Sequence, residues 1–394
     1  MAGNDLFDHL VHPEPTLWPG VRPAVAVRPI SAAEHERFAE SNAASILQTP
    51  AWAGVKRSWR SESLGWIEDG ELVGAALVLH RPVPGTNRSL AYVPEGPTLP
   101  WQRVVTDPAL WLDPFLEHLR AQHAFAVRIG PTQAVRSWET TTAKRGLSSP
   151  DLRRFSDLAP DRYERDGVAL LKVLSAQGWT SLEDESGAFT AGQPRLGVRL
   201  DLRERTPEQL LKGMNQQWRR NVKRSIAAGV SVRPGVKGDL AVFHRLYVET
   251  GERDGFTPRP LSYFEQMWDA LGPVLRLWVG EVEGQALAAA LTVDTDRTCW
   301  YTYGGSTSQR REVQASTAVQ WAAVQAALAR GNWMYDLRGI ADTLDENEKL
   351  SGLLRFKLGL GGTVQETTGE WEYTLSPLWH RAFQLHQRIQ KARS

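Results

Sequence analysis

Hydrophobic and polar positions divide this chain into short apolar runs separated by acidic and glycine-rich turns. Residues 64–82 (LGWIEDGELVGAALVLHRP) and residues 275–294 (LRLWVGEVEGQALAAALTVD) each contain two apolar runs around such a turn. This pattern predicts a β-hairpin in each half of the chain. Residues 90–99 and 299–308 then continue each hairpin with another apolar run that ends at a glycine turn. We expect a further strand at each of these positions.

A helix is predicted after the strands in each half. Apolar residues recur at three- and four-residue steps in residues 108–123 and 316–331, and a short apolar run follows each segment. The segments before the two hairpins, residues 48–59 and 259–270, also match each other. Because the elements recur in one order roughly 210 residues apart, the sequence predicts a tandem duplication.

The predicted fold class is α/β (α+β), two copies of a domain with mixed sheets, since a hairpin is antiparallel. The order of hairpin, strand, helix and strand is similar to that of the GNAT-like acyltransferase fold. We expect a first domain over residues 20–175 and a second over 176–370. Residues 371–394 are expected to form a C-terminal strand and helix that pack back on the first domain.

Composition narrows the possible ligands and compartments. The 394 residues include 46 basic and 45 acidic side chains, a net charge of +1, so an anionic ligand must meet a local basic patch. The only cysteine, Cys299, excludes an internal disulfide. Residues 1–20 lack the basic and apolar regions of a secretory signal, and the apolar runs are too short to cross a bilayer. We expect a cytoplasmic protein.

Several catalytic motifs are missing from the sequence. The nine histidines include no pair at the spacing of a helical zinc site, so no metal site is expected. The G-x-S-x-G elbow and the G-x-x-x-x-G-K-[ST] loop are also absent. No R-x-x-G-x-G/A run, which binds coenzyme A in acetyltransferases, is present. We therefore expect no cofactor, and coenzyme A-dependent acyl transfer is disfavoured.

A concentrated basic segment stands out in this neutral chain. Thr206 as N-cap, Pro207 at the first helical position and Gly229 beyond the end predict one helix over residues 207–228. Between residues 212 and 224 this helix carries only basic charges, on Lys212, Arg219, Arg220, Lys223 and Arg224. These charges indicate either a solvated helix face or a surface for the phosphates of RNA or of a diphosphate-linked substrate.

Five motifs in order resemble those of the FemABX peptidyltransferases and extend from about residue 45 to about residue 375. They are ILQTPAWAGVK, AYVPEGPTL, QQWRRNVKRSIAAGV, GNWMYDLRGI and LRFKLGLGGTVQETTGEWEY. The resemblance implies transfer of an amino acid from aminoacyl-tRNA to an amine in the stem peptide of a peptidoglycan precursor. The acceptor would be UDP-MurNAc-pentapeptide or lipid II, and a lipid-linked acceptor implies peripheral contact with the inner face of the membrane.

Two features depart from the family pattern. The strand that commonly ends I-D-P in the family reads IGP here, with Gly130 at the position of a carboxylate that contacts the precursor. That contact is therefore missing or supplied elsewhere. The basic helix runs directly into SVRPG, without the long helical arm that some members insert. The chain resembles the armless type.

Lys357 is the candidate catalytic residue. It lies in LLRFKLGLGGT, an apolar segment that we interpret as buried strand and turn. The resemblance places the lysine that stabilises the oxyanion at this position, although the residue alone could equally be a lysine extending to the surface. Phe356 would stack on the terminal adenosine of the donor. Arg219, Arg220 and Lys223 are the candidate contacts to the donor's phosphates.

The resemblance also implies residues for the acceptor. Lys56 and Arg259 match the family's phosphate-binding lysine and arginine, and Tyr263 and Tyr303 match tyrosines of the same cleft. Ordinary surface or core positions would explain these four residues as well. Asp336 in YDLRG could act as a base, but we interpret it as a structural ion pair or turn acceptor. The proton acceptor stays unassigned.

Three other functions are compatible with the sequence. The same tRNA-dependent transfer could serve a small amine or peptide in natural-product biosynthesis, an alternative that Gly130 keeps open. A non-catalytic protein that binds the precursor or RNA would retain the fold and lose the chemistry. A coenzyme A acyltransferase would need another means of binding the cofactor.

Overall fold

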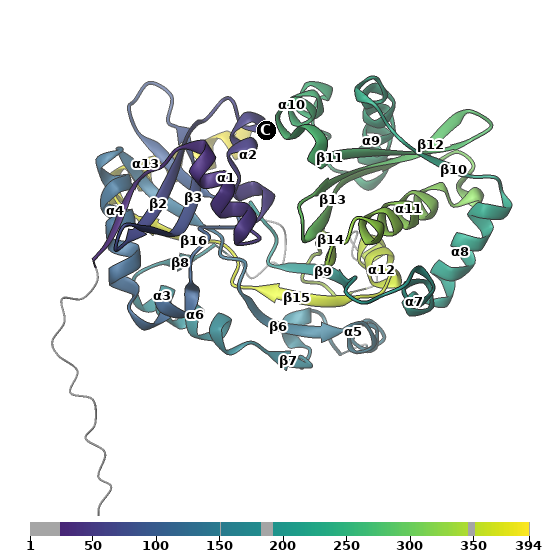
Figure 1. The fold of residues 1–394 in the computed structure, drawn as a ribbon, viewed down its shortest axis with the longest axis horizontal. Helices are drawn as coiled ribbons and strands as arrows, with labels where there is room; N and C mark the ends of the chain where they lie inside the picture. The colour runs from purple at the N-terminus through teal and green to yellow at the C-terminus, as the bar shows by residue number, and fades with distance from the viewer. Residues whose placement is uncertain (1–23, 150, 183–191, 346–350, 394) are drawn as a thin grey trace, which may run out of the picture.

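Two mixed β-sheets lie side by side in the computed structural model, which describes residues 24–149, 151–182, 192–345 and 351–393. Figure 1 shows the purple and blue first half on one side, the green second half on the other, and yellow β15 between them. The N-terminal segment assessed for a signal and part of the predicted connection, residues 183–191, lie outside the described residues.

The first sheet has seven strands. Their order is β1 (Val25–Pro29), β2 (Arg60–Glu68), β3 (Glu71–Pro82), β4 (Ser89–Val93), β5 (Ala124–Ile129), β16 (Trp371–Thr374) and β8 (Thr180–Ser181). The second sheet has nine strands. Their order is β10 (Ser231–Pro234), β11 (Leu275–Val282), β12 (Gln285–Asp294), β13 (Thr298–Ser306), β14 (Met334–Gly339), β9 (Leu196–Asp201), β15 (Thr363–Thr367), β6 (Ala134–Glu139) and β7 (Arg162–Tyr163).

The predicted duplication is confirmed. Strands β2 and β3 are antiparallel and β4 and β5 parallel, and the second half repeats this with β11, β12, β13 and β14. Helices α4 (Pro108–Ala121) and α11 (Ala315–Ala329) provide the crossovers between the parallel strands. The apolar runs form the cores, where Trp66 packs on Phe115 and both are fully buried.

Each sheet contains strands from both halves of the sequence. Strand β15 pairs with β6 from the first half, and β16 pairs with β5, while β8 extends the first sheet beyond β16. The sheets therefore do not divide the chain at residue 175, because β6 and β7 belong to the second sheet and β8 to the first. Local hydrophobic patterns specify strands but not their long-range partners, so the pairing of β6 with β15 has no signal in the sequence.

The matching helices before the hairpins pack against each other across the two halves. These are α2 (Pro50–Val55) and α10 (Leu261–Leu271). A Cβ atom at Gly54 would lie only 2.9 Å from Cβ of Ala270, a distance that real Cβ contacts do not reach. Glycine at this position therefore allows the close approach of the two helices.

The prediction of one helix over residues 207–228 is wrong. The chain forms α7 (Pro207–Gly213) and α8 (Gln216–Ala227), separated at Asn215. The Asn215 side chain accepts a hydrogen bond from the amide of Trp218 and so starts a new helix, because asparagine is a favoured N-cap. Three residues separate α8 from β10, so no helical arm is inserted at this position.

The prediction of strand and turn around Lys357 is also wrong, because residues 351–359 form α12 (Ser351–Gly359). Ser351, Leu354 and Leu358 are buried, at steps of three and four residues that keep them on one face of a helix, whereas residues three apart lie on opposite faces of a strand. The remaining helices are α1 (Ala32–Ser41), α3 (Trp101–Thr106), α5 (Thr140–Leu147), α6 (Arg165–Ala176), α9 (Leu240–Asp254) and α13 (Pro377–Arg393). Within the described ranges, no helix is long and apolar enough to span a membrane.

Candidate active site

Lys357 points into the protein from α12. Its side chain is 5% exposed, and its Nζ atom donates a 2.6 Å hydrogen bond to the carbonyl oxygen of Gly339, the last residue of β14. Burial lowers the pKa of this ammonium to about 7, Asp336 opposes the shift and Arg338 adds to it. Lys357 is therefore a buried lysine that is hydrogen-bonded inside the protein, and not a surface lysine.

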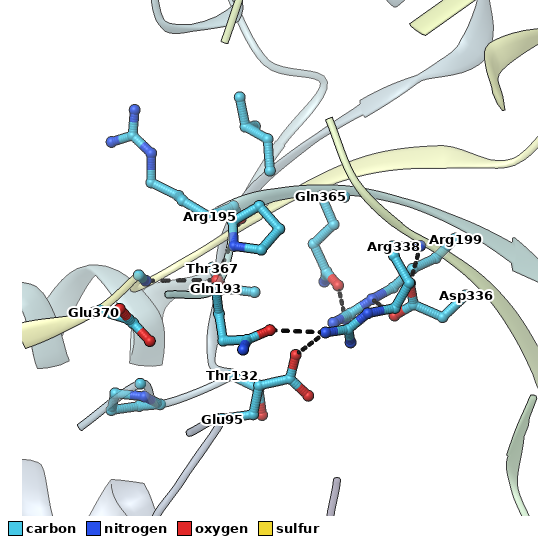
Figure 2. Close-up of a pocket in the computed structure, with 17 residues that line it drawn as sticks. Glu95, Thr132, Gln193, Arg195, Arg199, Asp336, Arg338, Gln365, Thr367 and Glu370 are labelled. Carbon is cyan, nitrogen blue, oxygen red and sulfur yellow. Dashed lines mark hydrogen bonds and ion pairs between the residues drawn. The ribbon is translucent and has the colours of Figure 1, made fainter. Parts of the chain in front are cut away.

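A polar pocket lies beside this lysine, between the two sheets. Gly339 forms part of its wall, so the carbonyl that binds Lys357 is shared with the pocket. Figure 2 shows the polar side chains that line it, which are Glu95, Thr132, Gln193, Arg195, Arg199, Asp336, Arg338, Gln365, Thr367 and Glu370. They come from both halves of the chain, since Glu95 and Thr132 follow β4 and β5, whereas Arg199, Asp336 and Gln365 lie on β9, β14 and β15.

An ion pair joins the two halves at this pocket. Arg338, at the end of β14, reaches Glu95 after β4, with Nη2 and Oε1 2.7 Å apart. The same guanidinium donates to Gln193, as Figure 2 shows. Both Arg338 and Glu95 have positive φ angles, 63° and 52°, which non-glycine residues rarely adopt. The backbone at both positions is therefore held in an unfavourable conformation, as is common at functional sites.

Asp336 is held by two hydrogen-bond donors. One carboxylate oxygen lies 3.2 Å from Nε of Arg199, and the other accepts a 2.6 Å hydrogen bond from the amide of Arg338. This is the arrangement of a structural ion pair and turn acceptor. Its negative charge also favours the protonated form of Lys357.

The four residues predicted for the acceptor come together. Arg259 stacks on the ring of Tyr263, with Cζ 4.7 Å from the centroid, and Lys56 Nζ lies 5.5 Å from the same centroid. The hydroxyl of Tyr303 donates to that of Tyr263 at 3.3 Å. Burial and the charge of Arg259 lower the pKa of Lys56. Within the described ranges, neither cation has a carboxylate partner, so the pair is suited to an anion.

Tyr303 connects this cation cluster with the pocket. The pairing of β13 and β14 ends at Trp300 and Asp336, and the residues that follow carry Tyr303 and Arg338. Tyr303 lies close enough to both Arg259 and Arg338 to raise the pKa of each guanidinium. The cation cluster and the pocket are thus neighbouring parts of one site.

The basic helix lies next to Lys357. Trp218 on α8 packs on Phe356, with ring centroids 4.9 Å apart, and donates a 3.0 Å hydrogen bond to its carbonyl oxygen. Arg220 and Lys223 are exposed on α8. Arg219 differs, because its guanidinium donates to carbonyl oxygens at the end of α7. The predicted donor residues therefore share one surface region, and the Arg219 guanidinium in it already forms hydrogen bonds within the protein.

Sequence reasoning missed Glu95, Gln193, Arg199 and Glu370. Glu95 stands in AYVPEGPTL, one of the segments that resemble family motifs, so its place in this turn was a usable signal. Glu370 lies between β15 and β16, two strands that belong to different sheets. A carboxylate in such a connection has no periodic pattern that would mark it as buried.

Comparison with known proteins agrees with this architecture. The FemAB family model matches residues 30–285 and 279–388. A lipid II:glycine glycyltransferase of Staphylococcus aureus (strain MRSA252) is 24% identical, over 92% of this chain and 96% of the relative. The enzyme of the same name from Staphylococcus epidermidis (strain ATCC 12228 / FDA PCI 1200) is 23% identical over the same shares.

Solved structures share the fold. The crystal structure of FemX has a TM-score of 0.75 at 21% identity and covers 90% of this chain and 99% of its own. A tandem GNAT protein from the clavulanic acid biosynthesis pathway has a TM-score of 0.50 at 13% identity, with 90% of this chain and 99% of that chain covered. The predicted tandem GNAT-like fold is thus confirmed, and this chain belongs to the FemAB family.

Proposed function

We propose that this protein transfers an amino acid from aminoacyl-tRNA to an amine in the stem peptide of a peptidoglycan precursor. The acceptor would be UDP-MurNAc-pentapeptide or lipid II. The observation that carries this proposal is the buried Lys357 ammonium, held by Gly339 at the wall of a pocket between the two halves. The lipid II:glycine glycyltransferase relatives, which align with most of the chain, support the reaction class.

The reaction needs a stabilised oxyanion. The acceptor nitrogen attacks the ester carbonyl carbon, a C–N bond forms, the carbonyl oxygen becomes negative, and the C–O bond to the ribose then breaks. A lysine ammonium has three N–H donors, and Gly339 uses one of them, so two are left for that oxygen. Loss of one such contact commonly costs about 3–4 kcal/mol of barrier, a rate factor of about 10²–10³.

The donor would bind over α8 and α12. Phe356, half-buried against Trp218, offers a ring on which the terminal adenosine can stack. Arg220 and Lys223 are exposed cations for the RNA phosphates, and Arg219 adds charge from its fixed position.

The acceptor would bind through its diphosphate. Lys56 and Arg259 converge on Tyr263 without a carboxylate partner in the described part of the chain, so a diphosphate would neutralise both. Tyr263 and Tyr303 would line the path from this group toward the pocket. The stem peptide would then extend to the pocket beside Lys357.

A transfer assay tests this proposal directly. The protein is incubated with total tRNA charged with labelled amino acids and with a UDP-linked or a vesicle-embedded lipid-linked muramyl pentapeptide, with an RNase-treated control. We expect label on the precursor, none after RNase treatment, and little with Lys357→Ala. If label stays on tRNA with every precursor, the proposal fails, and the acceptor must be sought among small amines. The two acceptor arms also test contact with a membrane surface.

A further inference from the structure

Glu370 is a buried carboxylate in the pocket wall, and neither oxyanion stabilisation nor donor binding involves it. Its side chain is 1% exposed. Oε1 accepts a 2.6 Å hydrogen bond from the hydroxyl of Tyr92 on β4, and Oε2 accepts a 2.7 Å hydrogen bond from the amide of Gly192. Each carboxylate oxygen has two lone pairs, so both retain capacity for a further donor. In Figure 2, Glu370 and Arg338 approach the pocket from opposite sides.

Glu370 differs from the other carboxylates of the pocket in lacking a salt bridge among the described residues. Glu95 is paired with Arg338 at 2.7 Å and Asp336 with Arg199 at 3.2 Å. No salt bridge to Glu370 occurs among the residues that the structure describes. A buried carboxylate without a salt bridge is costly, and burial raises the pKa of Glu370, while the hydrogen bonds from Tyr92 and Gly192 and the charge of Arg128 partly oppose the rise. Such a group favours a ligand that brings a positive charge or a proton.

Glu370 and Gly130 lie opposite each other, just beyond the paired ends of β16 and β5. Trp371 of β16 pairs with Ile129 of β5, so the residues just before and just after these two face each other in the antiparallel ladder. A Cβ atom at Gly130 would lie 3.4 Å from Cγ of Glu370. A side-chain carboxylate at either position would thus enter the same part of the pocket.

We propose that Glu370 binds the ammonium group of the acceptor in this pocket and takes a proton from it before attack. This inference rests on the proposed function and deepens it. The N–H bond breaks and its electron pair stays on nitrogen, while the proton moves to a Glu370 oxygen. The neutral amine then attacks the ester carbonyl, and as the new amide nitrogen loses its second proton, the departing ribose oxygen gains one. Glu370 returns its own proton to solvent, so each turnover from an ammonium acceptor releases one proton.

Other titratable and charged groups face Glu370 and contribute to the pH dependence of its ionisation. They are Tyr92 on β4, Glu95 after β4, Arg128 on β5 and, across the pocket, Arg195, Arg199, Asp336 and Arg338. Tyr92 is the informative neighbour, because its hydrogen bond favours the ionised carboxylate. Its removal in Tyr92→Phe should raise the pKa of Glu370 and move the acidic limb of the pH–rate profile to higher pH.

The test compares Glu370→Gln with a matched variant, Glu372→Gln, in the transfer assay at several pH values. Glu372 lies two residues away, and its carboxylate pairs with Arg128 and His380 outside the pocket. We expect Glu370→Gln to lower kcat at least about 100-fold and to abolish the acidic limb, and Glu372→Gln to leave both within about threefold. Wild-type turnover with equal effects of the two variants would overturn the role of Glu370 and leave the proposed function standing. Absence of wild-type turnover would overturn both.

A rescue variant separates chemistry from folding. In Glu370→Gln/Gly130→Asp, the new carboxylate enters the same part of the pocket from β5, where the added Cβ would lie 3.2 Å from the amide nitrogen of Glu95. We expect this variant to recover at least about tenfold in kcat over Glu370→Gln and to regain an acidic limb. Recovery of unfolding temperature without recovery of the limb would show a structural role and overturn the proposal.

Discussion

Trp218 and Phe356 join the basic helix to the helix that carries Lys357. Their ring centroids lie 4.9 Å apart, and the indole Nε1 donates a 3.0 Å hydrogen bond to the Phe356 carbonyl oxygen. A side chain at Gly359 would overlap the Trp218 ring, so the packing of α8 on α12 also requires this glycine. A group that binds on α8 is therefore positioned relative to Lys357 through direct contact.

Removal of the Lys357 ammonium should abolish most of the transfer activity. We expect Lys357→Met to lower kcat by about 10²–10³, because the oxyanion loses its cation while the volume of the side chain is retained. Single-turnover rates with charged tRNA and precursor measure this effect. Lys172→Met, which changes an exposed lysine on α6, serves as the matched control. Equal losses in the two variants would exclude the assigned role of Lys357.

The same substitution should stabilise the fold below neutral pH. The pKa of Lys357 is about 7 in the folded protein and 10.5 in an unperturbed lysine. Between these two pH values, the unfolded chain therefore binds one proton that the folded protein has lost. The free energy of unfolding therefore rises with pH across this window, and the full cost of the buried charge is present below pH 7. We expect Lys357→Met to increase the free energy of unfolding at pH 6 by about 1–4 kcal/mol.

Denaturant titrations at pH 6 and pH 10 measure this difference. The gain should shrink at the higher pH, where the folded wild-type protein holds a neutral lysine. A variant that is less stable than wild type at pH 6 would contradict a buried ammonium at this position.

The ring of Phe356 should contribute to donor affinity. Phe356→Leu keeps an apolar side chain against Trp218 but removes the stacking surface. We expect the KM for charged tRNA to rise about 5- to 150-fold, which corresponds to about 1–3 kcal/mol per stacked base. Trp333→Leu changes an exposed aromatic residue that stacks on Arg297 and serves as the control. An unchanged KM in Phe356→Leu would place the adenosine elsewhere.

The cations around Tyr263 should set affinity for the diphosphate of the acceptor. We expect Arg259→Lys and Lys56→Met each to raise the KM for the precursor about tenfold or more, since a charge-assisted hydrogen bond contributes about 1.5–3 kcal/mol. With an acceptor peptide that lacks the diphosphate, the same variants should behave as wild type. Sensitivity to the substitutions with both acceptors would argue that Lys56 and Arg259 only maintain the contact of α2 with α10.

Local patterns in the sequence were sufficient for the hairpins, the crossover helices and the duplication. They were insufficient at Lys357, because a glycine-rich apolar run is compatible with strand or helix until the core contacts of Leu354 and Leu358 are known. The break at Asn215 was missed because an asparagine inside a basic helical pattern is a weak signal unless its side chain is seen to cap Trp218.

The candidate site was predicted only as far as family motifs reach. The fold brings together the four residues predicted from family motifs, Lys56, Arg259, Tyr263 and Tyr303. The ion pair of Glu95 and Arg338 instead joins two residues about 240 positions apart, one from each half of the chain. Such a contact follows from tertiary packing, which no local propensity encodes.

The exchange of strands between the sheets makes each half dependent on the other. A fragment that starts near residue 176 would lose β6 and β7, leave one side of β15 without a partner, and carry β16 without its partner β5. A fragment that ends there would expose β5 and lack its partner β16. Unpaired strand edges promote aggregation. Neither copy of the duplicated unit can thus complete its own sheet, and an ancestor with a single copy must have paired these strand edges in another way.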